Sequence, residues 1–235
     1  MSAKEIDLSK TINPFTVWEE RAQIPGLRSV MSLGLSDKEA ELESSKLITS
    51  VHNFLGNEFP KGNILEFGTG IGRFTRELSV RSNSVTTLDL SKTMLERARV
   101  NCEGMTNVSY IRASADHIPT KDVIFDGIFE VTVLLHMPDK QFHDILKEAK
   151  RVLKPGGKMF LCGPIATETT RVHQYVTHRT LAQYENALKP FQIDRQENLE
   201  CPNYSYTMYM VSAPVLEANN LGKNSYSKKL LKSTP

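Results

Sequence analysis

Between residue 36 and about residue 165, the chain alternates stretches with the spacing of amphipathic helices and short apolar stretches typical of buried strands. Ser36-Asp37-Lys38-Glu39 has the residue types of a capping box, and apolar residues recur at helical spacing after it as far as Leu55. Strands are predicted at residues 63–67, 84–90, 108–111 and 124–130 and after Pro155-Gly156-Gly157. Because strands that alternate with helices pair in parallel, this pattern predicts an α/β fold whose sheet is covered by helices on both faces.

The last third of the chain departs from this alternation. A helix is predicted at residues 177–188, and two extended segments, FQIDRQENLE and YSYTMYMV, follow it. The short connection Cys201-Pro202-Asn203 joins them as in a β-hairpin. We therefore expect a doubly wound, mostly parallel sheet of seven strands with a C-terminal antiparallel hairpin.

No linker divides the chain into two globular domains. Residues 36–214 hold the alternating pattern and the hairpin, so we expect them to form one domain. Residues 1–35 are a separate segment without that pattern. Residues 215–235 lack periodicity, and we expect a basic, flexible tail there, with a basic docking segment as the alternative. This tail carries four lysines: Lys223, Lys228, Lys229 and Lys232.

Composition narrows the class of protein. Of the 235 residues, 40% are hydrophobic and 24% are charged, as in globular proteins with a sizeable core. The formal net charge is +2 and no dense Lys/Arg block occurs, which argues against a nucleic-acid partner. Cys102, Cys162 and Cys201 are widely spaced, unlike a disulfide framework or a metal site, so we expect thiols in a reducing compartment and no metal. No apolar run approaches the roughly 18 residues of a membrane span, and we expect a cytoplasmic protein.

The stretch LEFGTGIGRF, residues 65–74, places three glycines directly after the first predicted strand. Ligands of open α/β sheets bind beyond the carboxyl ends of the strands, and glycine lets a ligand approach the main chain. Arg73 and Phe74 replace the Lys-Ser/Thr of a P-loop, and Arg73 also breaks the dinucleotide fingerprint. Asp89 ends the next strand, where a carboxylate can accept both hydroxyls of a ribose. The pattern favours a nucleoside with little or no phosphate; a tight turn without a ligand is the alternative.

With these residues in place, the sequence resembles the class I S-adenosylmethionine-dependent methyltransferases from about residue 36 to residue 213. LEFGTGIGRF is similar to their first motif, and LDLSKTMLERAR is similar to the segment with the ribose-binding acid. YIRASADHIPTKDVIFDGIFEVTVLLHMPD resembles the stretch that wraps the adenine, and RVLKPGGKMFLCGP resembles the turn into the fifth strand. The resemblance is to the small-molecule branch, with its quinone-biosynthesis and natural-product enzymes. It implies a Rossmann-like fold, S-adenosylmethionine as cofactor and S-adenosylhomocysteine as product.

The resemblance also implies which residues hold the cofactor. By this resemblance, Glu66 and the glycine loop would hold the amino-acid part of the cofactor, and Asp89 would bind the ribose. Leu90 and residues 114–116 would contact the adenine, and Glu130 would lie near the sulfonium. Ser114 stands where many relatives carry an aspartate, so either Ser114 or Asp116 would meet the adenine amino group. The full set of expected cofactor-binding residues is Glu66, Gly68, Thr69, Gly70, Asp89, Leu90, Ser114, Ala115, Asp116 and Glu130.

We expect the binding site for the methyl acceptor to be formed by the least regular segments, residues 1–35 and 164–180. His136 follows the fourth strand and is the candidate general base, with capping of the helix after Pro138 as the alternative. Residues 1–35 are expected to form a lid in which Trp18 shapes the acceptor pocket and Arg28 or Arg21 pairs with the methionine carboxylate. Tyr175 is the further candidate for substrate binding.

The predicted activity is transfer of a methyl group to oxygen, nitrogen or carbon of a small or medium-sized metabolite, governed mainly by alignment. Two alternatives stay open: a peptide or protein methyltransferase, and a regulatory protein that binds S-adenosylmethionine without catalysis. The expected assembly is a monomer or a homodimer.

Overall fold

The computed structural model describes residues 13–173, 175–202 and 205–215. The four lysines of the expected basic tail lie outside the described residues, as does most of that tail. In the described part of the chain, no helix is both long and apolar enough to cross a bilayer.

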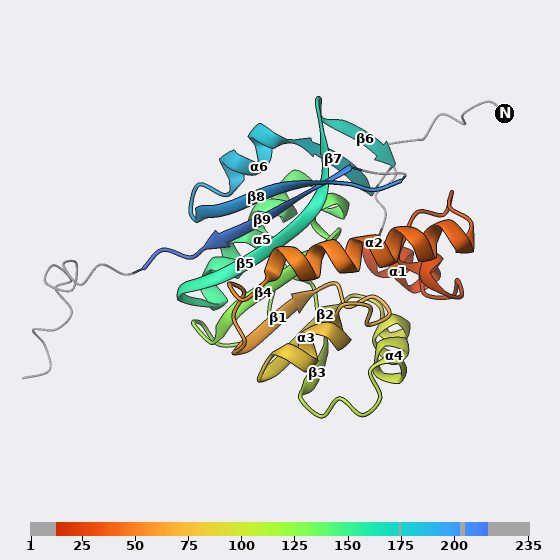
Figure 1. Cartoon of the computed structure of the whole chain (residues 1–235), viewed down its shortest axis with the longest axis horizontal. Helices are drawn as coiled ribbons and strands as arrows, with labels where there is room; N and C mark the ends of the chain where they lie inside the picture. Colours follow the sequence, from red (N-terminus) through yellow and green to blue (C-terminus); the bar gives the residue numbers. More distant parts are fainter. Residues whose placement is uncertain (1–12, 174, 203–204, 216–235) are drawn as a thin grey trace, which may run out of the picture.

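A twisted sheet with the predicted parallel core runs through the molecule (Figure 1). The first five strands are parallel and stand in the order β3-β2-β1-β4-β5, so the order reverses between β1 and β4. β9 pairs antiparallel with β5, and β8 pairs antiparallel with β9, which confirms the C-terminal hairpin. The bounds are β1 Asn63–Phe67, β2 Ser84–Asp89, β3 Val108–Arg112, β4 Phe125–Val131, β5 Leu153–Ala166, β8 Gln192–Glu200 and β9 Ser205–Ser212.

The expected count of seven strands is wrong, because the described residues form a sheet of nine. The two additional strands, β6 (Thr170–His173) and β7 (Val176–Thr180), form an antiparallel ribbon. β7 continues the sheet beside the end of β5, where Ile165 and Ala166 pair with Arg179 and Thr180. This ribbon extends beyond the carboxyl edge of the central strands (Figure 1).

The helix predicted at residues 177–188 is shorter than expected for the same reason. Residues 176–180 are strand β7, and α6 spans Leu181–Ala187. The Thr180 hydroxyl accepts a hydrogen bond from the Gln183 N–H, and the Gln183 side chain accepts from the Thr180 N–H, which is a capping box. The helix therefore begins after Thr180.

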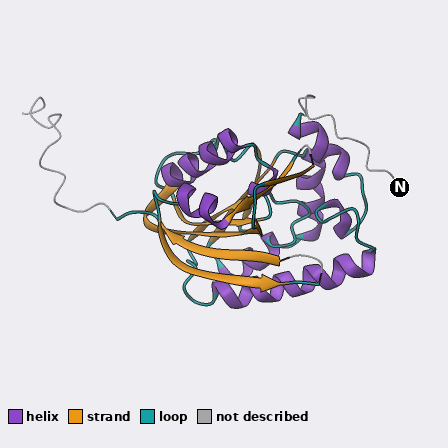
Figure 2. Cartoon of the chain, turned by 90° about the horizontal axis from the view of Figure 1, so that it is seen from above, coloured by secondary structure: helices purple, strands orange, loops and turns teal. Residues whose placement is uncertain are grey.

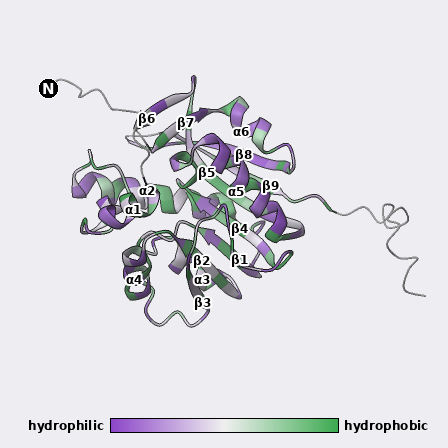
Figure 3. Ribbon diagram, turned by 180° about the vertical axis from the view of Figure 1, so that it is seen from behind, coloured by the Kyte–Doolittle hydropathy of each residue, from purple (hydrophilic) through white to green (hydrophobic). Residues whose placement is uncertain are grey.

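Helices cover both faces of the sheet (Figure 2). One core lies under α2 (Asp37–Leu55) and α3 (Thr75–Arg81) and includes Phe54, Phe129 and Phe160. The other lies under α5 (Asp139–Val152) and α6 and includes Phe67 and Phe142. Figure 3 shows the helices banded in both hydrophobic and hydrophilic colours, as expected for helices with one face on a sheet. The helices are α1 Pro14–Arg21, α2 Asp37–Leu55, α3 Thr75–Arg81, α4 Lys92–Asn101, α5 Asp139–Val152 and α6, with 3₁₀ turns η1 Leu27–Ser29 and η2 Leu134–His136.

The predicted capping box at the start of α2 is present. The Ser36 hydroxyl accepts from the Glu39 N–H, and the Glu39 carboxylate accepts from the Ser36 N–H at 2.8 Å. α2 thus begins where its sequence signal predicts, and it leaves residues 13–35 as a separate segment that crosses the carboxyl edge of the sheet.

Candidate active site

A cavity of about 100 Å³ lies at the carboxyl ends of β1, β2 and β4, where the strand order reverses. It brings together eight of the ten expected cofactor-binding residues. Asp116 and Glu130 do not line it. The eight that do are Glu66, Gly68, Thr69, Gly70, Asp89, Leu90, Ser114 and Ala115.

The glycine loop needs glycine for both its conformation and its packing. Gly68 has a φ of 68°, in the left-handed region, and a Cβ there would lie 2.3 Å from Cγ2 of Val133. Gly70 has a φ of 52°, and a Cβ there would lie 2.7 Å from Cγ1 of Val30. The glycines bring the loop backbone against the turn after β4 and against the N-terminal segment. The loop therefore forms one wall of the cavity.

Asp89 presents a carboxylate held in place by the main chain. Its Oδ2 accepts a hydrogen bond from the Gly70 N–H at 2.8 Å, and its Oδ1 accepts from the Ser91 N–H at 2.9 Å. Burial raises the pKa of Asp89 to about 6, although these backbone hydrogen bonds favour the ionised form. Each carboxylate oxygen can accept a further bond, so this group fits a vicinal diol.

Glu66 occupies the end of β1 and is buried, with 2% of its surface exposed. Its Oε2 accepts hydrogen bonds from the hydroxyls of Thr75 (2.6 Å) and Thr87 (2.7 Å). Burial raises the pKa of Glu66 to about 7. Because both bonds go to Oε2, Oε1 is the oxygen left to a ligand, and the carboxyl group can receive an ammonium.

Glu130, which was expected beside the sulfonium, does not line the cavity. Its Oε1 accepts from the N–H groups of Val133 and Leu134, the latter at 3.0 Å. Burial raises its pKa to about 7. The carboxylate is thus occupied in holding the turn after β4, while its neighbours Phe129 and Val131 line the cavity. The structure places Glu130 behind the wall of the cavity.

The His136 ring lines the cavity and has a defined tautomer. Its Nδ1 lies 3.0 Å from the carbonyl oxygen of Tyr175, which can only accept, so Nδ1 carries the proton and Nε2 is free of one. The Trp18 ring meets the imidazole edge-on, with 4.7 Å between centroids. Burial lowers the pKa of His136 to about 4. The alternative role as a helix cap does not apply, because α5 begins after Pro138 without a side-chain cap.

The other expected acceptor residues lie outside this cavity. Arg28 donates to the carbonyl of Leu33 at 3.1 Å, and Arg21 donates to the carbonyls of Ser29 and Arg28. Neither arginine lines the cavity, so the expected pairing of Arg28 with the methionine carboxylate has no support in the geometry. Tyr175 reaches the site through its main-chain oxygen and lines an adjoining surface pocket.

Arg179 was missed because it falls in the segment predicted as helix. Its side chain is 2% exposed, and it donates to the carbonyls of Leu134 (3.1 Å) and Met137 (2.6 Å). It also donates to Oδ1 of Asp139 at 2.8 Å and packs 4.3 Å from the centroid of the Phe142 ring. Arg179 therefore fixes the turn that carries His136. Within the described ranges, no group of three acids, histidines or cysteines could hold a metal.

Comparison with known families agrees with this geometry. Residues 64–157 match the family model described as a methyltransferase domain. Demethylmenaquinone methyltransferase of Tropheryma whipplei is 35% identical over 99 residues, which is 42% of this chain and 40% of that protein. Methyltransferase GfsG of Streptomyces halstedii is 33% identical over 110 residues, 45% of this chain and 39% of that protein. The chain thus spans about 40% of the length of these curated relatives.

Solved structures show the same fold. Phosphoethanolamine N-methyltransferase 1 of Haemonchus contortus, in complex with phosphoethanolamine and S-adenosylhomocysteine, superposes with a TM-score of 0.68 at 18% identity, over 86% of this chain and 48% of that one. A SAM-dependent methyltransferase of Leishmania major gives a TM-score of 0.67 at 20% identity, over 83% and 81% of the two chains. Residues 64–157 thus match a methyltransferase domain, and the described chain has the fold of the solved S-adenosylmethionine-dependent methyltransferases.

Proposed function

We propose that this protein transfers the methyl group of S-adenosylmethionine to a small or medium-sized metabolite. The observation that carries the proposal is the anchored Asp89 carboxylate beside the glycine loop, in a cavity at the point where strand order reverses. The matched methyltransferase domain supports it.

The residues present fit this cofactor. Asp89 would accept the ribose hydroxyls, Leu90 would pack on the adenine, and Glu66 would receive the α-ammonium group. When bound, S-adenosylmethionine supplies a methyl group activated by its positively charged sulfur. The chain contributes alignment of the acceptor and exclusion of water, and alignment alone can lower a barrier by about 7–11 kcal/mol. The unprotonated Nε2 of His136 would accept the acceptor's proton or hydrogen bond.

The lining of the cavity favours a metabolite over a peptide. Phe67, Phe129, Val131, Val133 and Met137 contribute apolar surface to it. The N-terminal segment lies over one side, which would exclude a long chain. Relatives named for demethylmenaquinone and for phosphoethanolamine differ in acceptor, so the acceptor atom is left open in this proposal.

Calorimetric titration of the wild type and of Asp89→Ala with S-adenosylmethionine and S-adenosylhomocysteine tests the proposal. Loss of charge-assisted ribose contacts costs on the order of 1.5–3 kcal/mol, so the variant should bind about 10–150-fold more weakly. Asp122→Ala is the matched control, because Asp122 pairs with Arg151 on the surface and does not line the cavity. A folded wild type that binds neither compound would contradict the function.

Turnover then separates an enzyme from a binding protein. Methyl transfer to any member of a panel of phenols, amines and quinols supports the enzyme, with S-adenosylhomocysteine measured as the product. Tight cofactor binding together with no transfer across the panel would favour the regulatory alternative.

A further inference from the structure

Arg73 lines the cavity, and none of the expected roles uses its guanidinium group. It follows Gly72 at the end of the glycine loop and lines the cavity together with Glu66. Its Nη1 donates to the Ser44 hydroxyl at 3.3 Å, and the group lies 4.8 Å from the centroid of the Phe74 ring. These two contacts leave most of its five N–H donors available.

No anion neutralises this charge within the described part of the chain. No carboxylate oxygen there lies within 4.0 Å of the Arg73 nitrogens. Glu66 is near enough to influence the titration of Arg73, but the Glu66 Oε2 atom is bonded to Thr75 and Thr87. Burial lowers the pKa of Arg73 to about 10, which still leaves it cationic at neutral pH. A partly buried cation without a counter-ion is costly, and an anionic ligand would remove that cost.

The other arginines around the site are already engaged. Arg21 and Arg28 donate to carbonyls of the N-terminal segment, and Arg179 donates to the turn beneath His136. Arg73 is therefore the cation that the described lining of the cavity offers to a ligand.

We propose that Arg73 binds a carboxylate group in this cavity through charge-assisted, two-point hydrogen bonds. The inference rests on the proposed function, because it concerns the same site. Glu66 and Arg73 place an acid and a cation at the two ends of one loop, which complements the ammonium and carboxylate of an α-amino acid. The amino-acid tail of S-adenosylmethionine is one source of this carboxylate, and an acidic acceptor is the other.

Calorimetry with two nucleosides tests the cofactor as the source. S-adenosylhomocysteine has the amino-acid tail, whereas 5′-methylthioadenosine has none. Arg73→Met should bind S-adenosylhomocysteine at least tenfold more weakly than the wild type and bind methylthioadenosine unchanged, and Arg73→Lys should recover part of the loss. Arg99→Met is the matched control, because Arg99 packs on Tyr110 outside the cavity.

A second titration tests the acceptor as the source. Benzoate, a simple carboxylate, is titrated into the wild type and into Arg73→Met, each saturated with S-adenosylhomocysteine. Binding to the wild type that is lost in the variant assigns Arg73 to the acceptor.

Unchanged S-adenosylhomocysteine affinity in a folded Arg73→Met, together with no benzoate binding to the wild type, would overturn this inference alone. If the folded wild type binds neither nucleoside, the proposed function falls as well.

Discussion

Glu66, Asp89 and Glu130 end three neighbouring strands, yet each carboxyl group holds a different part of the site. Asp89 is fixed by two backbone N–H groups at the cavity wall. Glu66 lines the cavity and accepts hydrogen bonds from two hydroxyl groups, whereas Glu130 accepts from the main chain of the turn after β4. Burial raises the pKa of all three groups. At the residue scale, the site therefore holds three acidic groups whose ionised forms are destabilised by burial.

This cost predicts a dependence of stability on pH. The folded pKa of Glu66, about 7, lies above its ordinary value of 4.5, so the folded state binds more protons than the unfolded state between these values. Its contribution is fully present below the ordinary value and is lost as the pH rises through about 7. Between pH 6 and pH 8, the free energy of unfolding should therefore fall less in Glu66→Gln than in the wild type. The two drops should differ by on the order of 1 kcal/mol.

Urea unfolding at both pH values measures this difference. The comparison with the wild type cancels the titration of other groups, and Glu77→Gln on the exposed side of α3 is the control. Equal slopes in the wild type and Glu66→Gln would show that Glu66 titrates as it does in the unfolded chain.

His136 should stay neutral across the physiological range. Burial lowers its pKa to about 4, whereas a histidine in water titrates near about 6.5. Its ring-proton resonance, assigned with His136→Gln, should therefore remain constant between pH 8 and pH 5.5. A midpoint near pH 6.5 would mean that the imidazole is solvated and not buried.

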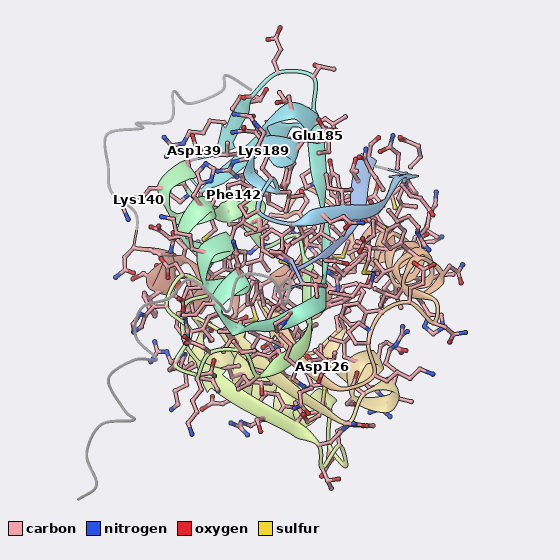
Figure 4. All side chains as sticks on the ribbon, turned by 90° about the vertical axis from the view of Figure 1, so that its left-hand side faces the viewer. Asp126, Asp139, Lys140, Phe142, Glu185 and Lys189 are labelled. Atoms are coloured by element: carbon pink, nitrogen blue, oxygen red, sulfur yellow. The ribbon has the colours of Figure 1, made fainter. Side chains whose placement is uncertain are left out.

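At the element scale, the β6–β7 ribbon is the part of the fold that supports His136. Tyr175, between its two strands, accepts the Nδ1 hydrogen bond, and Arg179 of β7 holds the carbonyls on both sides of His136. The ion-pair partner Asp139 and the stacked Phe142 both lie in the first turn of α5 (Figure 4). One strand therefore ties α5 and η2 together at the edge of the cavity.

Removal of the Arg179 hydrogen bonds to this turn should destabilise the fold. Arg179→Met leaves the Leu134 and Met137 carbonyls without their donor, and we expect it to lower the free energy of unfolding by on the order of 3 kcal/mol. Asp139→Asn is the matched control with an expected cost below about 1 kcal/mol, because the Asp139 side chain is 72% exposed. Denaturant unfolding measures both variants, and the His136 ring resonance should move only in Arg179→Met. Equal stability of the two variants would show that Arg179 does not hold the turn.

At the scale of the whole molecule, the N-terminal segment covers one side of the cavity. Trp18 and Val30 line it, while the segment is held on α4 by Arg97, which donates to the carbonyls of Ala22 and Ile24 at 2.9 Å each. Glu19 accepts from the Ser91 hydroxyl at 2.7 Å on the same side. The cavity of about 100 Å³ is smaller than the roughly 300–1,000 Å³ of typical ligand sites. We therefore predict that this segment moves when a cofactor enters.

Weakening the attachment should speed that entry. Arg97→Met removes the donors to the segment, and a loss of about 1 kcal/mol in the closed state corresponds to roughly fivefold faster opening. Trp18 is the single tryptophan of the chain and lines the cavity, so stopped-flow fluorescence with S-adenosylhomocysteine can follow association. Arg99→Met on the same helix is the control. An association rate that is the same in all three proteins would show that the segment does not limit entry.

Much of the fold could be predicted because its signals are local. The capping box at Ser36, the glycine loop and the strand that ends at Asp89 each depend on residues a few positions apart. The hairpin after residue 191 is of the same kind. Alternation of strands and helices predicts a parallel sheet, and ligands of such sheets bind at the carboxyl ends of the strands. The sequence by itself therefore determined the fold class, the edge of the sheet at which the cavity lies and ten of the residues that line it.

Only the tertiary structure decided which side chains are free to act. Arg179 finds its carbonyl partner 45 residues away, and Glu19 finds Ser91 72 residues away. Such pairings depend on how whole segments pack, and no spacing in the sequence encodes them. Arg28 bonds to its own segment and Glu130 accepts from main-chain donors, while Arg73 donates to the Ser44 hydroxyl. A charged group binds a ligand only through the donor or acceptor positions that its partners in the protein leave free, and contacts over long distances in the chain decide which positions these are.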